Sequence, residues 1–118
     1  MNTISTILVI FVAIEHFYFL VLEMFLWNKP KGIKTFGLKS KEFADDTKVL
    51  AANQGLYNGF LSAGLIFALI EKNIQFVFFF LICVTIAVIY GSYSTMNIRL
   101  FFVQSIPAIL ALIVLLFN

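Results

Sequence analysis

The chain has 118 residues, of which 62% are hydrophobic and only 12% are charged, and its formal net charge is +2. Soluble domains carry about 25% charged residues, and a domain of this length has too little interior to hide fifteen phenylalanines. The composition therefore predicts a membrane protein, and the small net charge argues against nucleic acid as a partner.

Four apolar stretches are each long enough to cross a bilayer as a helix, which takes about 20 residues. Because lipid cannot satisfy free backbone amides, and none of the stretches alternates like a barrel strand, we expect all four to be helical. The sequence thus predicts an all-α membrane protein with one domain over residues 1–118, a bundle of four transmembrane helices with an interfacial loop between the first two. We expect the first span to be retained, because no cleavage-site pattern follows it. The expected spans are about 4–27, 47–70, 74–94 and 98–117.

The first span carries three ionisable residues, Glu15, His16 and Glu23, although each costs at least ~2.5–3.5 kcal/mol inside a membrane. His16 and Glu23 are seven residues apart and therefore share nearly one face of a helix. We interpret the three residues as candidate catalytic groups, with a carboxyl and an imidazole as acid and base. We expect no metal there, because adjacent side chains point about 100° apart and the chain has a single histidine. No other cofactor is indicated.

The loop between the first and second spans holds most of the positive charge of the chain. Its lysines are Lys29, Lys31, Lys34, Lys39 and Lys41, whereas the connection between the second and third spans has only Lys72. By the positive-inside rule, we expect this loop in the cytoplasm and both termini outside it. Phe36, Leu38 and Phe43 alternate with the lysines, a pattern typical of an interfacial anchor attracted to anionic membrane lipid, with a soluble partner as the alternative. Ser40 is placed to cap a helix that continues into the second span.

Amide side chains of the second span are the expected partners of the first-span carboxylates. Gln54 and Asn58 lie one turn apart on one face, with Asn53 and Tyr57 beside them. By contrast, three stretches in the outer halves of spans two to four, LIFALI, FVFFFLICV and AILALIVLLF, contain no carboxyl, amine or amide side chain. We infer a polar pocket that opens toward the cytoplasm. The other candidate ligand-binding residues are Tyr18, Tyr90, Tyr93 and Gln104.

Two ladders of small residues at four-residue spacing predict a close helix contact, because small side chains let two backbones approach. The ladder of the second span is Ala51, Gly55, Gly59 and Ala63, and that of the third span is Ala87, Gly91 and Thr95. We expect the two ladders to pack against each other.

Two stretches of the sequence resemble a family of small bacterial integral membrane proteins, the domain of unknown function numbered 1304. The first reads E-H-x-Y-F-x-x-L-E-M-F-x-W from Glu15 to Trp27, and the second reads K-V-L-A-A-N-Q-G-L-Y-N-G-F-L-S-A-G-L from Lys48 to Leu65. The resemblance covers nearly the whole chain. It implies a short multi-pass protein with four spans in the bacterial cytoplasmic membrane, and it implies no particular activity.

Three functions fit these features. The first is a membrane pocket that binds a small lipophilic molecule entering from the inner leaflet, either with or without transforming it. The second is a proton-coupled exporter acting as a homodimer, since small multidrug transporters also have four spans and a carboxylate in the first, which is an analogy of layout alone. The third is a structural or regulatory helix bundle without a ligand, in which amides and carboxylates only tie helices together. The one-sided distribution of polar residues favours the first.

Overall fold

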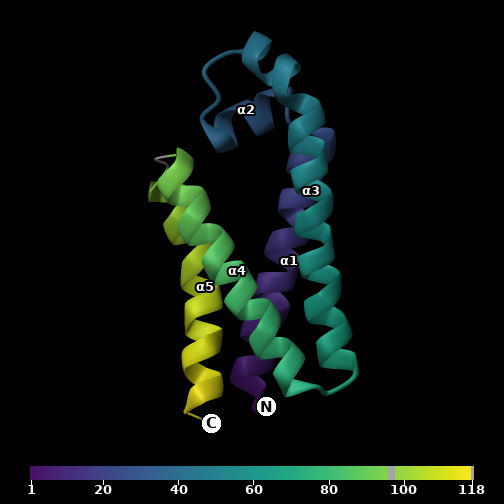
Figure 1. Cartoon of the computed structure of the whole chain (residues 1–118), viewed down its shortest axis with the longest axis vertical. Helices are drawn as coiled ribbons and strands as arrows, with labels where there is room; N and C mark the ends of the chain where they lie inside the picture. The colour runs from purple at the N-terminus through teal and green to yellow at the C-terminus, as the bar shows by residue number, and fades with distance from the viewer. Residues whose placement is uncertain (96–97, 118) are drawn as a thin grey trace. The chain divides into compact units, whose positions relative to one another are not determined.

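The computed structural model describes residues 1–95 and 98–117, and in these ranges it contains five α-helices and no strands (Figure 1). The all-α prediction is therefore confirmed for the described residues. Two segments are long and apolar enough to cross a membrane, Thr3–Phe25 and Ile74–Ser94, which is consistent with a membrane protein. In chain order the helices are α1 (Thr3–Phe25), α2 (Pro30–Phe36), α3 (Lys41–Ile70), α4 (Ile74–Thr95) and α5 (Ile98–Leu116).

Side-chain caps fix where three of the helices begin. The hydroxyl of Ser40 accepts a hydrogen bond from the Phe43 amide at 3.0 Å, so Ser40 caps α3 as the sequence predicted. Asn2 caps α1 and Asn73 caps α4 in the same way, each through its side-chain oxygen. Between α3 and α4, Lys72 adopts a positive φ of 53°, which turns the chain within three residues.

The short helix α2 lies inside the segment that was expected to be a loop. Pro30 occupies its first turn, where a missing amide hydrogen costs nothing, and Gly37 ends it with a φ of 62°. Gly32 is buried and packs so closely on the residues after α1 that a Cβ there would collide with the carbonyl oxygen of Leu26 and the backbone of Trp27. This segment thus folds back against the residues at the end of α1 and contacts Leu26 and Trp27.

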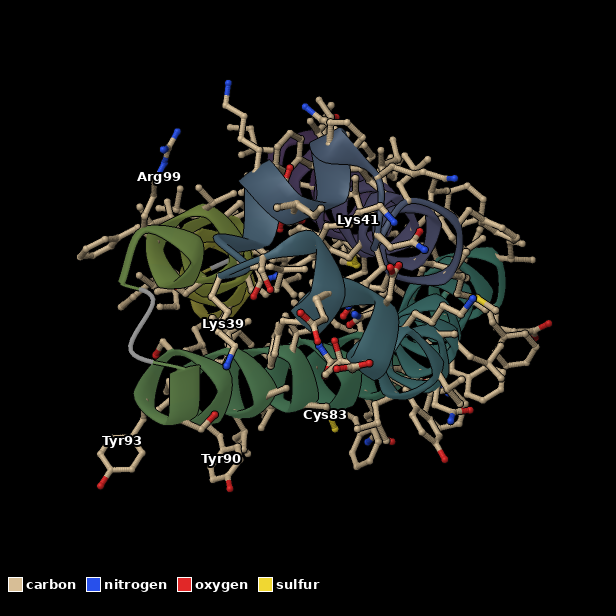
Figure 2. The ribbon with its side chains drawn as sticks, turned by 90° about the horizontal axis from the view of Figure 1, so that it is seen from above. Lys39, Lys41, Cys83, Tyr90, Tyr93 and Arg99 are labelled. Carbon is tan, nitrogen blue, oxygen red and sulfur yellow. The ribbon has the colours of Figure 1, made fainter. Side chains whose placement is uncertain are left out.

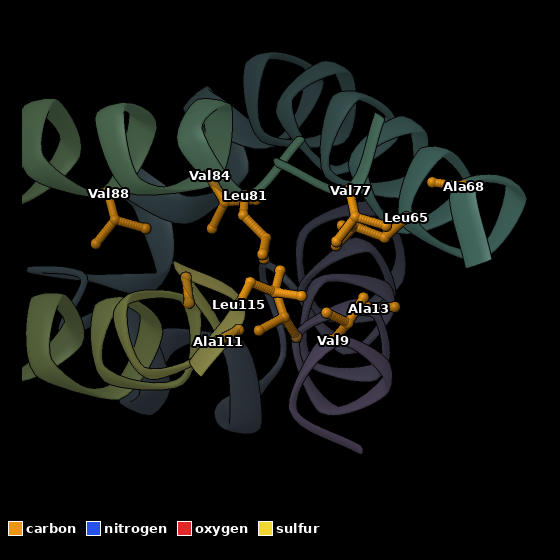
Figure 3. Packing of buried hydrophobic residues seen from close by; sticks show 12 residues of the cluster. Val9, Ala13, Leu65, Ala68, Val77, Leu81, Val84, Val88, Ala111 and Leu115 are labelled. Carbon is orange, nitrogen blue, oxygen red and sulfur yellow. The ribbon is translucent and has the colours of Figure 1, made fainter. Parts of the chain in front are cut away.

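The chain divides into two compact units, to both of which α1 and α3 contribute. Unit one comprises residues 1–15 and 61–118, and its core is a cluster of small and branched apolar side chains from α1, α3, α4 and α5 (Figure 3). Inside it, the hydroxyl of Ser62 donates a hydrogen bond of 2.7 Å to the carbonyl oxygen of Ala13. The labelled members of the cluster in Figure 3 include Val9, Leu65, Leu81, Val84, Ala111 and Leu115.

Unit two comprises residues 16–60: the second half of α1, all of α2 and the first two thirds of α3. Here α1 and α3 pack closely, because a Cβ at Gly55 would lie 3.0 Å from Cβ of Glu23 and 3.2 Å from the carbonyl oxygen of Leu20, both on α1. The ladder glycines Gly55 and Gly59 therefore face the first span, whereas Gly64, outside the ladder, packs on Phe80 of α4. The predicted contact with the third-span ladder was wrong for its described glycine, since a Cβ at Gly91 would meet nothing within 4 Å.

Each of the four long helices carries a stripe of large apolar side chains that the fold leaves exposed. On α1 the stripe follows a spacing of three and four residues, and its members are Ile4, Ile7, Phe11 and Ile14. On α4 it includes Phe79, Ile82, Ile86 and Ile89. The corresponding residues are Leu50, Phe60, Phe67 and Ile70 on α3 and Phe102, Ile106, Leu110 and Ile113 on α5. The buried faces of the same helices are made of smaller side chains.

Candidate functional site

The centre of the candidate site is the carboxylate of Glu23, which is only 1% exposed. Both of its oxygens are held by amides from α3. The side-chain nitrogen of Gln54 donates to one oxygen at 2.6 Å, and that of Asn58 donates to the other. The structure thus confirms the expected contact between the first-span carboxylate and this pair of second-span amides, while its functional role stays a prediction.

Close packing of α1 on α3 is what brings these groups together. A Cβ at Gly55 would lie 2.8 Å from Cγ of Met24 and 3.0 Å from Cβ of Glu23, so only glycine permits this approach. The asparagine side chain is short and reaches a neighbouring helix only when the two backbones are near. The small residues of α3 therefore position Asn58 as well as pack the helices.

Two polar contacts tie the end of α1 to the start of α3 beside the site. The indole nitrogen of Trp27 donates to the hydroxyl of Thr47 at 3.0 Å, and the amide of Asn28 donates to the carboxylate of Asp45 at 2.9 Å. The Asn28 amide, together with the Lys41 ammonium at 3.1 Å, lowers the pKa of Asp45 below its usual range. The first turns of α3 are thereby fixed against the residues that follow α1.

Aromatic rings join α2 to the same region. The ring of Phe36 lies 5.0 Å from that of Trp27 and 6.5 Å from that of Phe19, centroid to centroid. Phe19 in turn meets His16 edge to face at 5.8 Å. Such pairs contribute about 0.5–1.5 kcal/mol each beyond the area they bury. Phe36 is thus the residue through which α2 packs on α1.

A cavity of about 500 Å³ adjoins Glu23 within unit two. Apolar walls come from Met24, Phe25, Val49 and Ala52, and Trp27 also lines it. Its polar lining comes from Glu23, Asn28, Lys29, Lys48 and Asn53. A cavity with apolar walls and a few convergent polar groups is the usual form of a small-molecule site.

The other two candidate catalytic residues are placed differently from Glu23. His16 is buried and packs on Phe19, within unit two. Glu15 is half-buried and belongs to unit one, where its Oε1 is buried without a hydrogen-bond partner among the described residues. Of the three ionisable residues, only Glu23 lines the cavity.

Among the predicted ligand-binding residues, Asn53 lines the cavity and Gln54 and Asn58 hold Glu23, whereas the tyrosines are exposed. Tyr18 and Tyr57 are 43% and 67% exposed. Tyr90 and Tyr93 are still more exposed, and Figure 2 shows both rings pointing away from α4. Gln104 is half-buried on α5.

Of the residues that line the cavity, sequence analysis predicted only Glu23 and Asn53 as site residues, and it missed Trp27, Asn28, Lys29 and Lys48 among the others. Lys29 was counted only as part of a charged loop, and Lys48 only as the start of the second motif. The signal that would have found the others is the proline at position 30, because proline is favoured in a first helical turn and so predicts a separate helix that begins directly after α1.

Comparisons with known proteins identify the family. The sequence profile described as "Protein of unknown function (DUF1304)" matches residues 10–116. A protein described as uncharacterized protein YpaA, from Lactococcus lactis subsp. lactis (strain IL1403), is 34% identical over 116 residues, covering 96% of this chain and 97% of the relative. No solved structure matches the chain. The chain belongs to the DUF1304 family, as its two motifs predicted.

Proposed function

We propose that this chain is a multi-pass protein of the bacterial cytoplasmic membrane, crossing it through α1, α3, α4 and α5 as one four-helix domain. The exposed apolar stripes on all four helices support this, because water disfavours contiguous apolar surfaces of that extent and lipid accepts them. The side-chain amides of Gln54 and Asn58 lower the hydropathy of α3. They are compatible with a membrane span because Glu23 accepts their hydrogen bonds. The lysine-rich segment from Lys29 to Lys41 then lies in the cytoplasm, with both termini outside.

Within this architecture, we propose that the cavity beside Glu23 binds a small lipophilic molecule with a polar head. The observation that carries this function is that Glu23, a buried residue, and apolar side chains line one space of about 500 Å³. Amides alone would join two helices at a lower desolvation cost than a carboxylate. Glu23 also lies two residues before the end of α1, at the depth where polar head groups begin.

The experiment uses Trp27, the only tryptophan of the chain, which lines the cavity. Its fluorescence in the purified protein is recorded while single-chain and short-chain amphiphiles are titrated. Saturable changes are expected for the protein as isolated. Ala52→Phe fills the cavity and should abolish them, whereas Leu50→Phe places the same ring at a residue that is 71% exposed and does not line the cavity.

The same titrations separate binding from a purely structural role. If Ala52→Phe binds every amphiphile as the unchanged protein does, the cavity is not the binding site. If no amphiphile gives a saturable signal with the unchanged protein, Glu23 only ties α1 to α3, and the chain is a structural or regulatory bundle.

A second candidate, proton-coupled export by a homodimer, is favoured by Glu15. One of its oxygens is buried without a hydrogen-bond partner among the described residues, so this group has capacity to take up and release a proton. In proteoliposomes, export requires a proton flux driven by the transported compound and abolished by Glu15→Gln. A flux that survives this substitution would remove Glu15 from the mechanism.

A further inference from the structure

Two lysines that line the cavity of unit two carry positive charge that is not paired within the described part of the chain. Lys29 and Lys48 are both exposed, and neither forms an ion pair with the described residues. Lys48 acts on Asp45 only from a distance, because that carboxylate is held by the Asn28 amide and the Lys41 ammonium. The cavity therefore has two ammonium groups with which it can bind an anion.

These lysines and the carboxylate of Glu23 lie at different levels of the unit. Lys48 precedes Gly55, which packs against Glu23, by seven residues, so the two levels are roughly 10 Å apart along α3. Lys29 follows Glu23 by six residues, beyond the end of α1. Because Glu23 is 1% exposed and both of its oxygens already accept amide hydrogen bonds, it is not needed as a ligand-binding group. The lysines thus form a cationic end of the cavity, away from the buried carboxylate.

Apolar lining follows the lysines toward the level of Glu23. Val49 and Ala52 lie on α3 between Lys48 and Gly55, and Asn53 is the one amide of α3 that lines the cavity beside them. Met24 and Phe25 contribute the opposite wall from α1. In the proposed orientation, the lysines face the cytoplasmic surface and the apolar walls lie deeper. This order, charge first and hydrocarbon below it, is that of a lipid in the inner leaflet.

We propose that the ligand of this cavity is an anionic amphiphile whose phosphate head is bound by Lys29 and Lys48 and whose alkyl chain runs along Val49 and Ala52. The inference rests on the proposed binding function and names its ligand class. Lysine binds phosphate as a point charge, without requiring a particular geometry. Two lysines favour a phosphate monoester over a diester, because the monoester carries more negative charge at neutral pH.

Three soluble probes test the head group, namely the dihexanoyl forms of phosphatidic acid, phosphatidylglycerol and phosphatidylcholine. They share the same tails, and their negative charge falls in that order to a net of zero. Each is titrated in an uncharged detergent while the fluorescence of Trp27 is recorded. We expect phosphatidic acid to bind at least about tenfold more tightly than the choline lipid, with the glycerol lipid between them. Added salt should narrow the difference. Glycerol 3-phosphate, a monoester without tails, should bind more weakly than phosphatidic acid.

Matched lysine variants separate a defined site from the general attraction of a basic segment. Lys29→Gln and Lys48→Gln should each weaken phosphatidic acid several-fold and change the choline lipid least. Lys34→Gln in α2 removes the same charge from a residue that does not line the cavity, and it should change neither lipid. Because Lys29 and Lys48 are exposed, we expect their variants to fold, and retained binding of the choline lipid verifies this.

Equal affinity for all three lipids, with Ala52→Phe still abolishing each, would overturn the anionic ligand while the amphiphile cavity stands. A loss in Lys34→Gln as large as that in Lys48→Gln would replace the site by diffuse attraction to the lysine-rich segment. Binding of glycerol 3-phosphate as tight as that of phosphatidic acid would overturn the amphiphile and leave a soluble phosphate ester as the ligand. If no lipid and no other amphiphile binds, the proposed function itself fails.

Discussion

Glu23 shows how a largely apolar helix retains a buried carboxylate. The residue is buried, and its hydrogen bonds run to two amides one turn apart on α3. The predicted partnership rested on residue type and on helical spacing, and both were sufficient to find it. Helical spacing could not predict that residues following α1 line the cavity, because their position depends on how the chain turns outside the regular helix.

Truncating Glu23 should destabilise unit two. Glu23→Ala leaves the amides of Gln54 and Asn58 without their acceptor, and we expect the free energy of unfolding to fall by about 1–3 kcal/mol. Thermal unfolding in detergent, followed by circular dichroism, measures the change. Glu71→Ala, at an exposed turn residue, is the control and should stay within about 0.5 kcal/mol. An unchanged unfolding temperature for Glu23→Ala would contradict the role of the carboxylate in holding the helices.

Two glycines of the chain give a matched pair of substitutions. Gly55→Ala places a methyl group against Cβ of Glu23 and the carbonyl oxygen of Leu20, neither of which can rotate away, so we expect destabilisation and weaker packing of α1 on α3. Gly91→Ala enters open space in a helix, and we expect it to be neutral or to stabilise by about 0.5–1 kcal/mol through helix propensity. Thermal unfolding of both variants checks this. Equal effects would mean that Gly55 is not at a close helix contact.

At the scale of elements, the helix positions and the pairing of α1 with α3 through polar side chains were predicted, whereas the pairing of the two small-residue ladders was wrong at Gly91. The predicted spans at 4–27, 47–70, 74–94 and 98–117 correspond to the long helices α1, α3, α4 and α5, although their crossing of a membrane is a proposal. The small-residue ladders were assigned to each other because small residues permit close approach, but they do not choose a partner. On α3 that choice follows the amides, since Gln54 and Asn58 need Glu23 of α1.

The start of α3 offers a test of a single cap. Ser40→Ala removes the hydroxyl that accepts the Phe43 amide hydrogen, and we expect a loss of about 1 kcal/mol together with fraying of the first turns of α3. Backbone hydrogen exchange over residues 41–46 measures the fraying. Ser94→Ala, which removes an exposed hydroxyl near the end of α4, is the control, and its effect on residues 41–46 should be absent. Unchanged exchange in Ser40→Ala would show that other contacts fix this end of α3.

For the whole molecule, composition predicted the class of membrane protein. The orientation across the membrane was predicted only from the distribution of lysines. Orientation is tested by single cysteines placed in a Cys83→Ser background. A membrane-impermeant maleimide added to intact cells should label Phe117→Cys, and it should label Lys34→Cys only after the cells are lysed. The reverse pattern would place the cavity of Glu23 at the outer face of the membrane. The charge rule predicts orientation because translocating lysines is costly, whereas the sequence contains no comparable rule for which ligand a cavity holds.

The length of α3 has a consequence for how the protein meets the aqueous phase. Its 30 residues make a helix of roughly 45 Å, whereas the hydrocarbon core of a bilayer is about 30 Å thick. If α3 crosses upright, about two to three turns therefore stand in the head groups and beyond, and these are the turns that carry Lys41 and Asp45. In that case the first turns of α3 would form a short, rigid helical extension that soluble proteins can reach. The Trp27–Thr47 and Asn28–Asp45 contacts hold this extension against the residues that follow α1.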